Sequence, residues 1–264
     1  MDHGTSGVAM SYRELGEGAL DPLVLLHAFP LNGRMFEGQM KAFSGSRRVI
    51  APDYPGFGRS PRTPAQPDIR YYAEGVRGLL DRQHLGRVVL GGVSMGGYVA
   101  FECMRLFPER VSALVLANTR PEPDPEETRE IRNEMALRVA QEGVEVLVEL
   151  QMERLLAPEA MRDDELVQNV RAMILENSPD GAVAALGAMR ERPDSTALLG
   201  GLDVPTLVIG GEEDGISTPE VMGAMAAKIP GARHVTMPQT GHLSNLEAPE
   251  KFNTTLDEFL KSTQ

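Results

Sequence analysis

Short, continuously apolar runs alternate along this chain with stretches whose apolar residues recur at helical spacing. A continuously apolar run is typical of a strand in a parallel sheet covered by helices on both faces. Most of the runs that predict strands are of this kind; the runs lie at residues 8–12, 23–26, 48–51, 88–90, 113–116, 206–209 and 233–237. Helices are expected at 72–82 and after Thr218-Pro219, where threonine caps and proline fills the first turn. The alternation predicts an α/β fold with a mostly parallel, doubly wound sheet.

Residues 121–192 break this rhythm, because they contain no strand pattern and only helical periodicity. The apolar positions that share a helix face there are Ile131, Met135 and Val139, and then Val167, Val170 and Ile174. We interpret the segment as an all-helical cap inserted after the sixth strand, with residues 1–120 and 193–264 forming the core. No Phe, Tyr or Trp occurs in it, which favours a flexible aliphatic ligand over a stacked ring.

Composition excludes several classes of partner. The 264 residues are 42% apolar and 24% charged, with a formal net charge of −12, which disfavours nucleic acid and anionic membranes. No run resembles a signal peptide or a membrane span. Cys103 is the single cysteine, so no intrachain disulfide is possible and a cytoplasmic location is expected. We expect neither a metal nor a cofactor, since no binding motif for either appears. Monomer and homodimer both remain open.

The candidate chemistry centres on Gly92-x-Ser94-x-Gly96, which lies between the run at 88–90 and a helical pattern beginning at Tyr98. A serine on such a tight strand-to-helix turn adopts a strained backbone conformation that lifts its hydroxyl out of the sheet. This setting favours a nucleophile, which needs a base and a third group to orient that base.

The five histidines leave one strong candidate for the base. His242 follows the last predicted strand, at the sheet edge where Ser94 also emerges. We assign no chemistry to His3 near the N-terminus, His84 in a polar loop or His234 inside a strand. The acid should follow the strand at 206–209, where residues 212–214 offer two glutamates and one aspartate; the other candidate strand end, at 117–119, carries no carboxylate.

Together these motifs resemble the α/β-hydrolase superfamily, and in particular small bacterial carboxylesterases and 3-oxoadipate enol-lactonases. The features that carry the resemblance are His27-Ala28-Phe29-Pro30, residues 52–60, the turn around Ser94, residues 211–214 and Gly241-His242. The resemblance implies that Ser94 is the nucleophile, Asp214 the acid and His242 the base. It also implies an oxyanion hole formed by the backbone N–H groups of Phe29 and Met95, with His27 supporting that loop. Ala28 departs from the pattern, since a glycine is commoner there.

The resemblance implies a reaction at a carboxylic ester. Haloalkane dehalogenases and epoxide hydrolases use an aspartate where this chain has Ser94. We therefore predict a carboxylesterase that cleaves short- to medium-chain aliphatic esters through an acyl-enzyme. The alternatives are a lactonase acting on enol-lactones or acyl-homoserine lactones with the same residues, and a non-catalytic ligand receptor on the same fold. In each case the partner is a small molecule.

Overall fold

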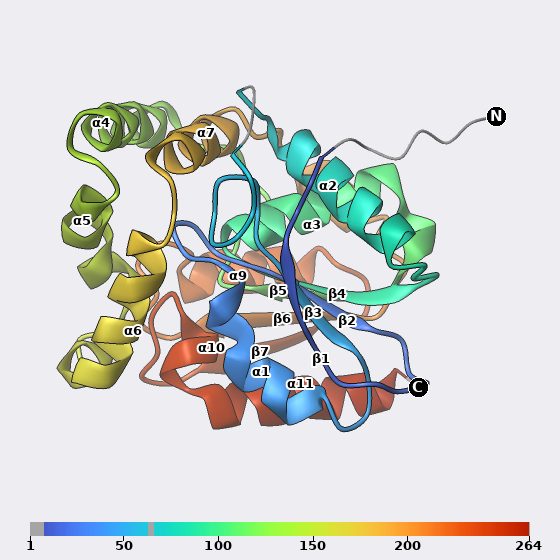
Figure 1. Cartoon of the computed structure of the whole chain (residues 1–264). Helices are drawn as coiled ribbons and strands as arrows, with labels where there is room; N and C mark the ends of the chain where they lie inside the picture. Colours follow the sequence, from blue (N-terminus) through green and yellow to red (C-terminus); the bar gives the residue numbers. More distant parts are fainter. Residues whose placement is uncertain (1–7, 63–65, 264) are drawn as a thin grey trace.

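One twisted sheet runs through the computed structural model, which describes residues 8–62 and 66–263 (Figure 1). Within these residues the sheet has seven strands in the order β1-β3-β2-β4-β5-β6-β7. Only β1 is antiparallel to its neighbour, and the other pairings are parallel. The strands are β1 (Tyr12–Leu15), β2 (Leu23–Leu26), β3 (Val49–Pro52), β4 (Val88–Val93), β5 (Val111–Ala117), β6 (Thr206–Gly211) and β7 (Arg233–Met237). The predicted fold class is confirmed.

The first strand differs from its prediction at 8–12, because β1 begins only at Tyr12. Val8 and Met10 are buried all the same, and their side chains approach Gly75 of the helix α2 (Ile69–Arg82). The apolar pattern at 8–12 therefore reflects packing on a helix instead of pairing in the sheet.

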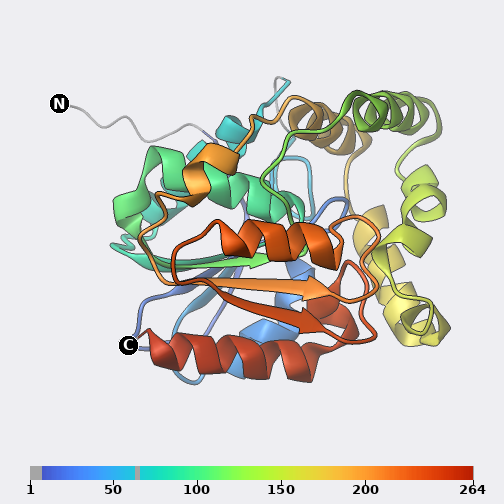
Figure 2. The same ribbon diagram turned by 180° about the vertical axis from the view of Figure 1, so that it is seen from behind.

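Helices cover both faces of the sheet, as a doubly wound architecture requires. On one face lie α2, α3 (Met95–Leu106) and α9 (Pro219–Ala227), and on the other lie α1 (Glu37–Phe43) and α11 (Pro249–Ser262) (Figures 1 and 2). The central strands are consequently buried from both sides; every residue of β2 and β4 is buried. This explains why their sequences are continuously apolar. The α9 helix begins at Pro219 with Thr218 in the N-cap position, as predicted, but the Thr218 side chain makes no capping hydrogen bond.

Four further helices gather at the carboxyl edge of the sheet, the edge toward which β6 and β7 point (Figure 2). They are α4 (Glu126–Glu142), α5 (Glu145–Leu155), α6 (Asp164–Leu175) and α7 (Pro179–Arg190). We call them the cap helices. They follow β5, the fifth strand of the described chain, and not the sixth as expected; five apolar runs, from 8–12 to 113–116, also precede residue 121 in the sequence.

The remaining helices of the described chain are short: η1 (Gly33–Phe36), η2 (Pro108–Arg110), η3 (Ala160–Arg162), α8 (Thr196–Leu199) and α10 (Ser244–Glu247).

Cys103 of α3 is fully buried, and burial raises the pKa of its thiol well above the ordinary value. Across residues 8–62 and 66–263, none of the helices has the length and apolar character needed to cross a membrane.

Candidate active site

Ser94 occupies the sharp turn between β4 and α3, with a φ of 53° and a ψ of −114°. A non-glycine residue held there costs on the order of 1–3 kcal/mol. The turn closes because Gly92 and Gly96 lack side chains: a Cβ on Gly92 would lie 2.3 Å from the Gly96 carbonyl carbon, and one on Gly96 would lie 2.1 Å from the Leu26 oxygen. The Ser94 N–H also donates to the Ala117 carbonyl of β5 at 2.9 Å. The neighbouring strands therefore hold the strained serine in place.

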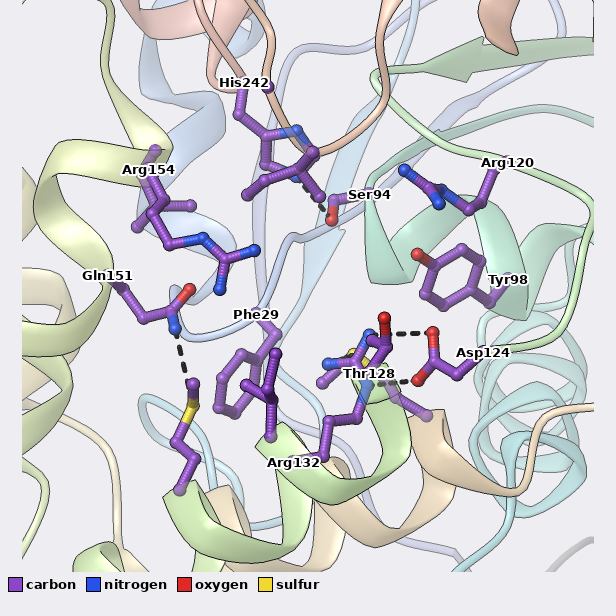
Figure 3. Close-up of a pocket in the computed structure, with 16 residues that line it drawn as sticks. Phe29, Ser94, Tyr98, Arg120, Asp124, Thr128, Arg132, Gln151, Arg154 and His242 are labelled. Carbon is purple, nitrogen blue, oxygen red and sulfur yellow. Dashed lines mark hydrogen bonds and ion pairs between the residues drawn. The ribbon is translucent and has the colours of Figure 1, made fainter. Parts of the chain in front are cut away.

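A continuous chain of hydrogen bonds joins Ser94, His242 and Asp214. The Ser94 Oγ lies 2.7 Å from His242 Nε2, a contact drawn in Figure 3. On the other side of the ring, His242 Nδ1 lies 2.8 Å from Asp214 Oδ2. All three side chains are buried. An ionised Asp214 accepts a hydrogen bond from the Nδ1–H of His242, which leaves Nε2 free to accept a hydrogen bond from the serine hydroxyl.

Asp214 is held as a carboxylate by donors on both oxygens. Its Oδ1 accepts the backbone N–H groups of Ile216 at 2.8 Å and Ser217 at 2.9 Å, and its Oδ2 accepts Asn118 Nδ2 at 3.0 Å in addition to His242. Burial by itself would raise the pKa of Asp214, but His242, Asn118 and Ser217 outweigh burial and lower that pKa below its ordinary value. The carboxylate is consequently ionised at neutral pH.

Asn118 is a residue of this site that sequence reasoning missed. It follows β5, is fully buried and has a φ of 47°. Besides Asp214, its Nδ2 donates to the Gly241 carbonyl at 3.1 Å, and its Oδ1 accepts the Ser244 hydroxyl at 2.6 Å. One amide thus joins the acid to the loop that carries His242. The sequence signal for Asn118 is a polar residue directly after a buried strand, but the prediction of the acid uses strand ends only where they carry a carboxylate.

The loop around His242 has a second anchor in Glu247. Its carboxylate accepts the backbone N–H groups of Gly241 at 2.9 Å and Leu243 at 3.1 Å, the two residues that flank His242. The same carboxylate accepts the N–H of Ala157, which follows α5, at 2.9 Å. The cap helices and the histidine loop therefore share one acceptor, so the position of the cap is tied to that of the imidazole.

His27 supports the loop that contains Phe29 and does not line the cavity beside Ser94. Its Nε2 accepts the Tyr54 N–H at 3.0 Å and its Nδ1 lies 3.0 Å from the Ala28 carbonyl, an arrangement that fits a neutral ring protonated at Nδ1. Burial lowers the pKa of His27 to about 4. Phe29 follows β2 and lines the cavity beside Ser94, while Met95 is the first residue of α3. Their N–H groups are the predicted oxyanion donors.

The remaining candidates lie away from these contacts. His84 and His234 are exposed, the first after α2 and the second on β7, and His3 lies outside the described residues. Glu212 and Glu213 are exposed, and Asp214 alone of the three neighbouring carboxylates contacts His242. Within the described residues, no group of three or more His, Cys, Asp or Glu side chains could hold a metal ion.

Ser94 and His242 open into a cavity of about 250 Å³ between the sheet edge and the cap helices (Figure 3). The cap contributes aliphatic side chains, as expected, among them Met135 and Leu155. It also contributes polar ones, including Arg132, Gln151 and Arg154, which the expectation of an aliphatic lining missed. The apolar face predicted from the periodicity does reach the cavity through Ile131 and Met135. Apolar periodicity carries no information on the polar residues that border the cavity beside that face.

Comparison with known proteins agrees with this geometry. Residues 21–249 match the family model described as alpha/beta hydrolase fold. The chain belongs to this family. A thermophilic esterase from Thermogutta terrifontis, solved with malate bound, is 39% identical, with a TM-score of 0.93 over 97% of this chain and 94% of the esterase. The family resemblance drawn from the sequence is thereby confirmed.

Two curated relatives broaden the picture. A 3-oxoadipate enol-lactonase 2 from Acinetobacter baylyi is 26% identical over 96% of this chain and 94% of its own length. A dihydrolipoyllysine-residue acetyltransferase component of the acetoin cleaving system from Pseudomonas putida is 30% identical over 97% of this chain and 67% of its own length. Proteins similar to this hydrolase thus carry different activities on one fold, so the reaction must be argued from the site.

Proposed function

We propose that this protein is a serine carboxylesterase in which Ser94 is the nucleophile, His242 the general base and Asp214 the orienting acid. The observation that carries the proposal is the unbroken Asp214–His242–Ser94 hydrogen-bond chain, with contacts of 2.8 and 2.7 Å, ending at a cavity large enough for a small ester. A serine needs this arrangement because its hydroxyl is a poor nucleophile until a base accepts its proton.

The reaction proceeds in two halves. Ser94 Oγ attacks the ester carbonyl carbon while His242 Nε2 takes the hydroxyl proton, and the imidazolium is stabilised by the ionised Asp214. The tetrahedral intermediate collapses, the ester C–O bond breaks, and the imidazolium gives its proton to the departing alcohol. Water then attacks the acyl-enzyme with His242 again as base, and the carboxylic acid leaves as Ser94 regains its proton.

The negative charge of each tetrahedral intermediate needs donors, and we assign these to the N–H groups of Phe29 and Met95. Met95 is at the N-terminus of α3, where the helix dipole also favours negative charge. His27 keeps the Phe29 loop in position through its bonds to Ala28 and Tyr54. Loss of one such donor typically costs about 10²–10³ in kcat.

A lactonase using the same residues is the second candidate, and it is favoured by the similarity to the enol-lactonase over nearly the full length of both chains. Its chemistry is identical except that the alcohol stays attached to the acyl group. Comparing kcat/KM for p-nitrophenyl butyrate with values for a panel of lactones separates the two. A lactone preferred over every open ester would assign the lactonase.

The proposal is tested with Ser94→Ala and a serine-directed fluorophosphonate. The wild-type protein should hydrolyse p-nitrophenyl butyrate and take up one phosphonate per chain at Ser94, located by peptide mass spectrometry. Ser94→Ala should lose both while keeping its Tm within a few degrees. The exposed Ser262→Ala serves as the matched control and should retain both. Hydrolysis at background level in the folded wild-type protein would instead support a ligand receptor.

A further inference from the structure

The cavity beside Ser94 is positively charged although the chain carries a net charge of −12. Among the described residues, the charged side chains that line it are Arg120, Arg132, Arg154 and Asp124. The net negative charge of the protein repels anions at long range. The excess of guanidinium groups around Ser94 is therefore a local feature of the cavity. Each arginine must either have a partner in the protein or be available to a ligand.

Arg132 has its partner in the protein. Its guanidinium pairs with the Asp124 carboxylate, which also contacts Arg192 Nη1 at 2.5 Å. Burial would raise the pKa of Asp124, but the two arginines outweigh burial and lower that pKa below its ordinary value. Arg192 in turn lies over the Tyr98 ring, 4.2 Å from its centroid. Arg132, Asp124 and Arg192 therefore form one wall of the cavity, and the two arginines are paired with the Asp124 carboxylate.

Arg120 and Arg154 have no hydrogen-bond or ion-pair partner within residues 8–62 and 66–263. They come from different parts of the fold: Arg120 follows β5 and is half-buried, and Arg154 lies in the last turn of α5 and is exposed. Figure 3 shows their guanidinium groups entering the cavity from opposite sides, with Ser94 between their two backbones. Two unpaired guanidinium groups that converge on one cavity are available to an anion.

We propose that the ester cleaved at Ser94 carries a free carboxylate, which Arg120 and Arg154 bind. The inference rests on the proposed ester hydrolysis and adds the substrate class: half-esters of aliphatic dicarboxylic acids. The planar guanidinium fork matches the geometry of a carboxylate and gives charge-assisted hydrogen bonds. The aliphatic side chains of Met135 and Leu155 suit the methylene chain between the carboxylate and the ester. A neutral ester of equal length would leave both arginines without a partner.

The test compares esters that differ only in this charge. Monoethyl adipate and ethyl hexanoate have similar length, as do monoethyl succinate and ethyl butyrate, and a pH-stat measures hydrolysis of each. We expect kcat/KM to favour the half-ester by about tenfold or more in at least one pair at low salt. The preference should shrink as ionic strength rises, because salt screens the guanidinium groups. Comparing kcat/KM for the monoethyl esters of malonate through adipate shows which chain length best matches the distance between the arginines and Ser94.

Substitution of the arginines should remove the preference. Arg120→Gln should lower the half-ester to neutral-ester ratio of kcat/KM on the order of ten- to a hundredfold, and Arg154→Gln should lower it less because solvent screens its exposed side chain. Arg171→Gln is the matched control, since it removes an exposed arginine from α6 that does not line the cavity. Its ratio should equal that of the wild type.

The two proposals fail in different ways. If no ester is hydrolysed, the carboxylesterase proposal falls. If both members of every pair are hydrolysed with equal kcat/KM, or if Arg171→Gln changes the ratio as much as Arg120→Gln, the carboxylate site is wrong while the esterase stands. Calorimetry gives a readout without turnover: adipate should bind the Ser94→Ala protein, and adding Arg120→Gln should abolish that binding. Equal adipate affinity in both proteins would overturn the site.

Discussion

Replacing Asn118 with aspartate should create a pH-dependent loss of stability. In the native protein Asn118 Nδ2 lies 3.0 Å from Asp214 Oδ2, and Asn118 is fully buried. The substitution keeps the size of the side chain but places a second carboxyl group against the first. Protonated, the new carboxyl can donate its single O–H to Asp214, yet it cannot also serve the Gly241 carbonyl. Ionised, it repels Asp214 directly.

The short distance between the side chains of residues 118 and 214 sets the size of the repulsion in the variant. Two unit charges about 4 Å apart repel by about 4 kcal/mol at an effective dielectric constant of roughly 20, which is about three pKa units at ~1.36 kcal/mol per unit. The new carboxyl, whose pKa is ordinarily about 3.9, should therefore titrate near pH 7 in the folded protein, with the pair holding one proton below that pH.

Proton linkage gives the direction in which the stability of the Asn118→Asp variant changes with pH. Between about pH 4 and pH 7 the folded variant holds a proton that the unfolded chain has released, so its stability falls as pH rises. Relative to the wild type, Asn118→Asp should lose about 1 kcal/mol near pH 4.5 from the missing donor, and about 5 kcal/mol above pH 7.5 once the repulsion is added. At ~2–4 °C per kcal/mol, the deficit in Tm should grow from a few degrees to about 10–20 °C.

Thermal unfolding from pH 4.5 to 8.5 measures this deficit in Tm. Gln168→Glu is the control, since it adds the same charge on the exposed surface of α6, and its Tm curve should run parallel to that of the wild type. Parallel curves for Asn118→Asp as well would refute the argument, because the amide could not then contact the Asp214 carboxylate.

Two further predictions concern single residues of the site. Asp214→Asn should lower kcat on the order of 10⁴-fold, as the same change does in serine proteases, because an amide favours the wrong imidazole tautomer; Glu213→Gln should have little effect in the same assay, and comparable losses would mean that the wrong acid was assigned. His27, whose pKa burial lowers to about 4, costs the folded protein on the order of 3 kcal/mol between pH 6.5 and 4, where only the unfolded chain gains the proton. His27→Gln should therefore show a flatter dependence of Tm on pH across that window, and an unchanged slope would place the ring in solvent.

The sequence predicts the order of the helices and strands, but not the residues at which each of them begins and ends. The runs at 23–26 and 206–209 are apolar on both faces, and such a run has few alternatives to a central parallel strand. At 8–12 the same signal misled, because Val8 and Met10 are buried against α2, outside the sheet. Periodicity reports burial, and a residue can be buried by a helix or by a neighbouring strand with the same pattern.

The candidate nucleophile and base were accessible from the sequence because their backbone settings leave local traces. Ser94 needs glycines two residues away on each side, and His242 follows the last strand. The choice of Asp214 came from family resemblance and from the shorter side chain, and the structure places that residue, not its two glutamate neighbours, 2.8 Å from the imidazole.

Asn118, Glu247 and the charge of the cavity were decided by tertiary structure alone. Asn118 meets Asp214 only because parallel strands end at one edge, and no local pattern marks a side chain whose partners lie 96 and 126 residues away. Arg120 and Arg154 belong to the core and the cap and converge only when the cap helices lie over the sheet. Local sequence specifies which face of an element is buried, whereas the contents of a cavity depend on how separate elements are packed together.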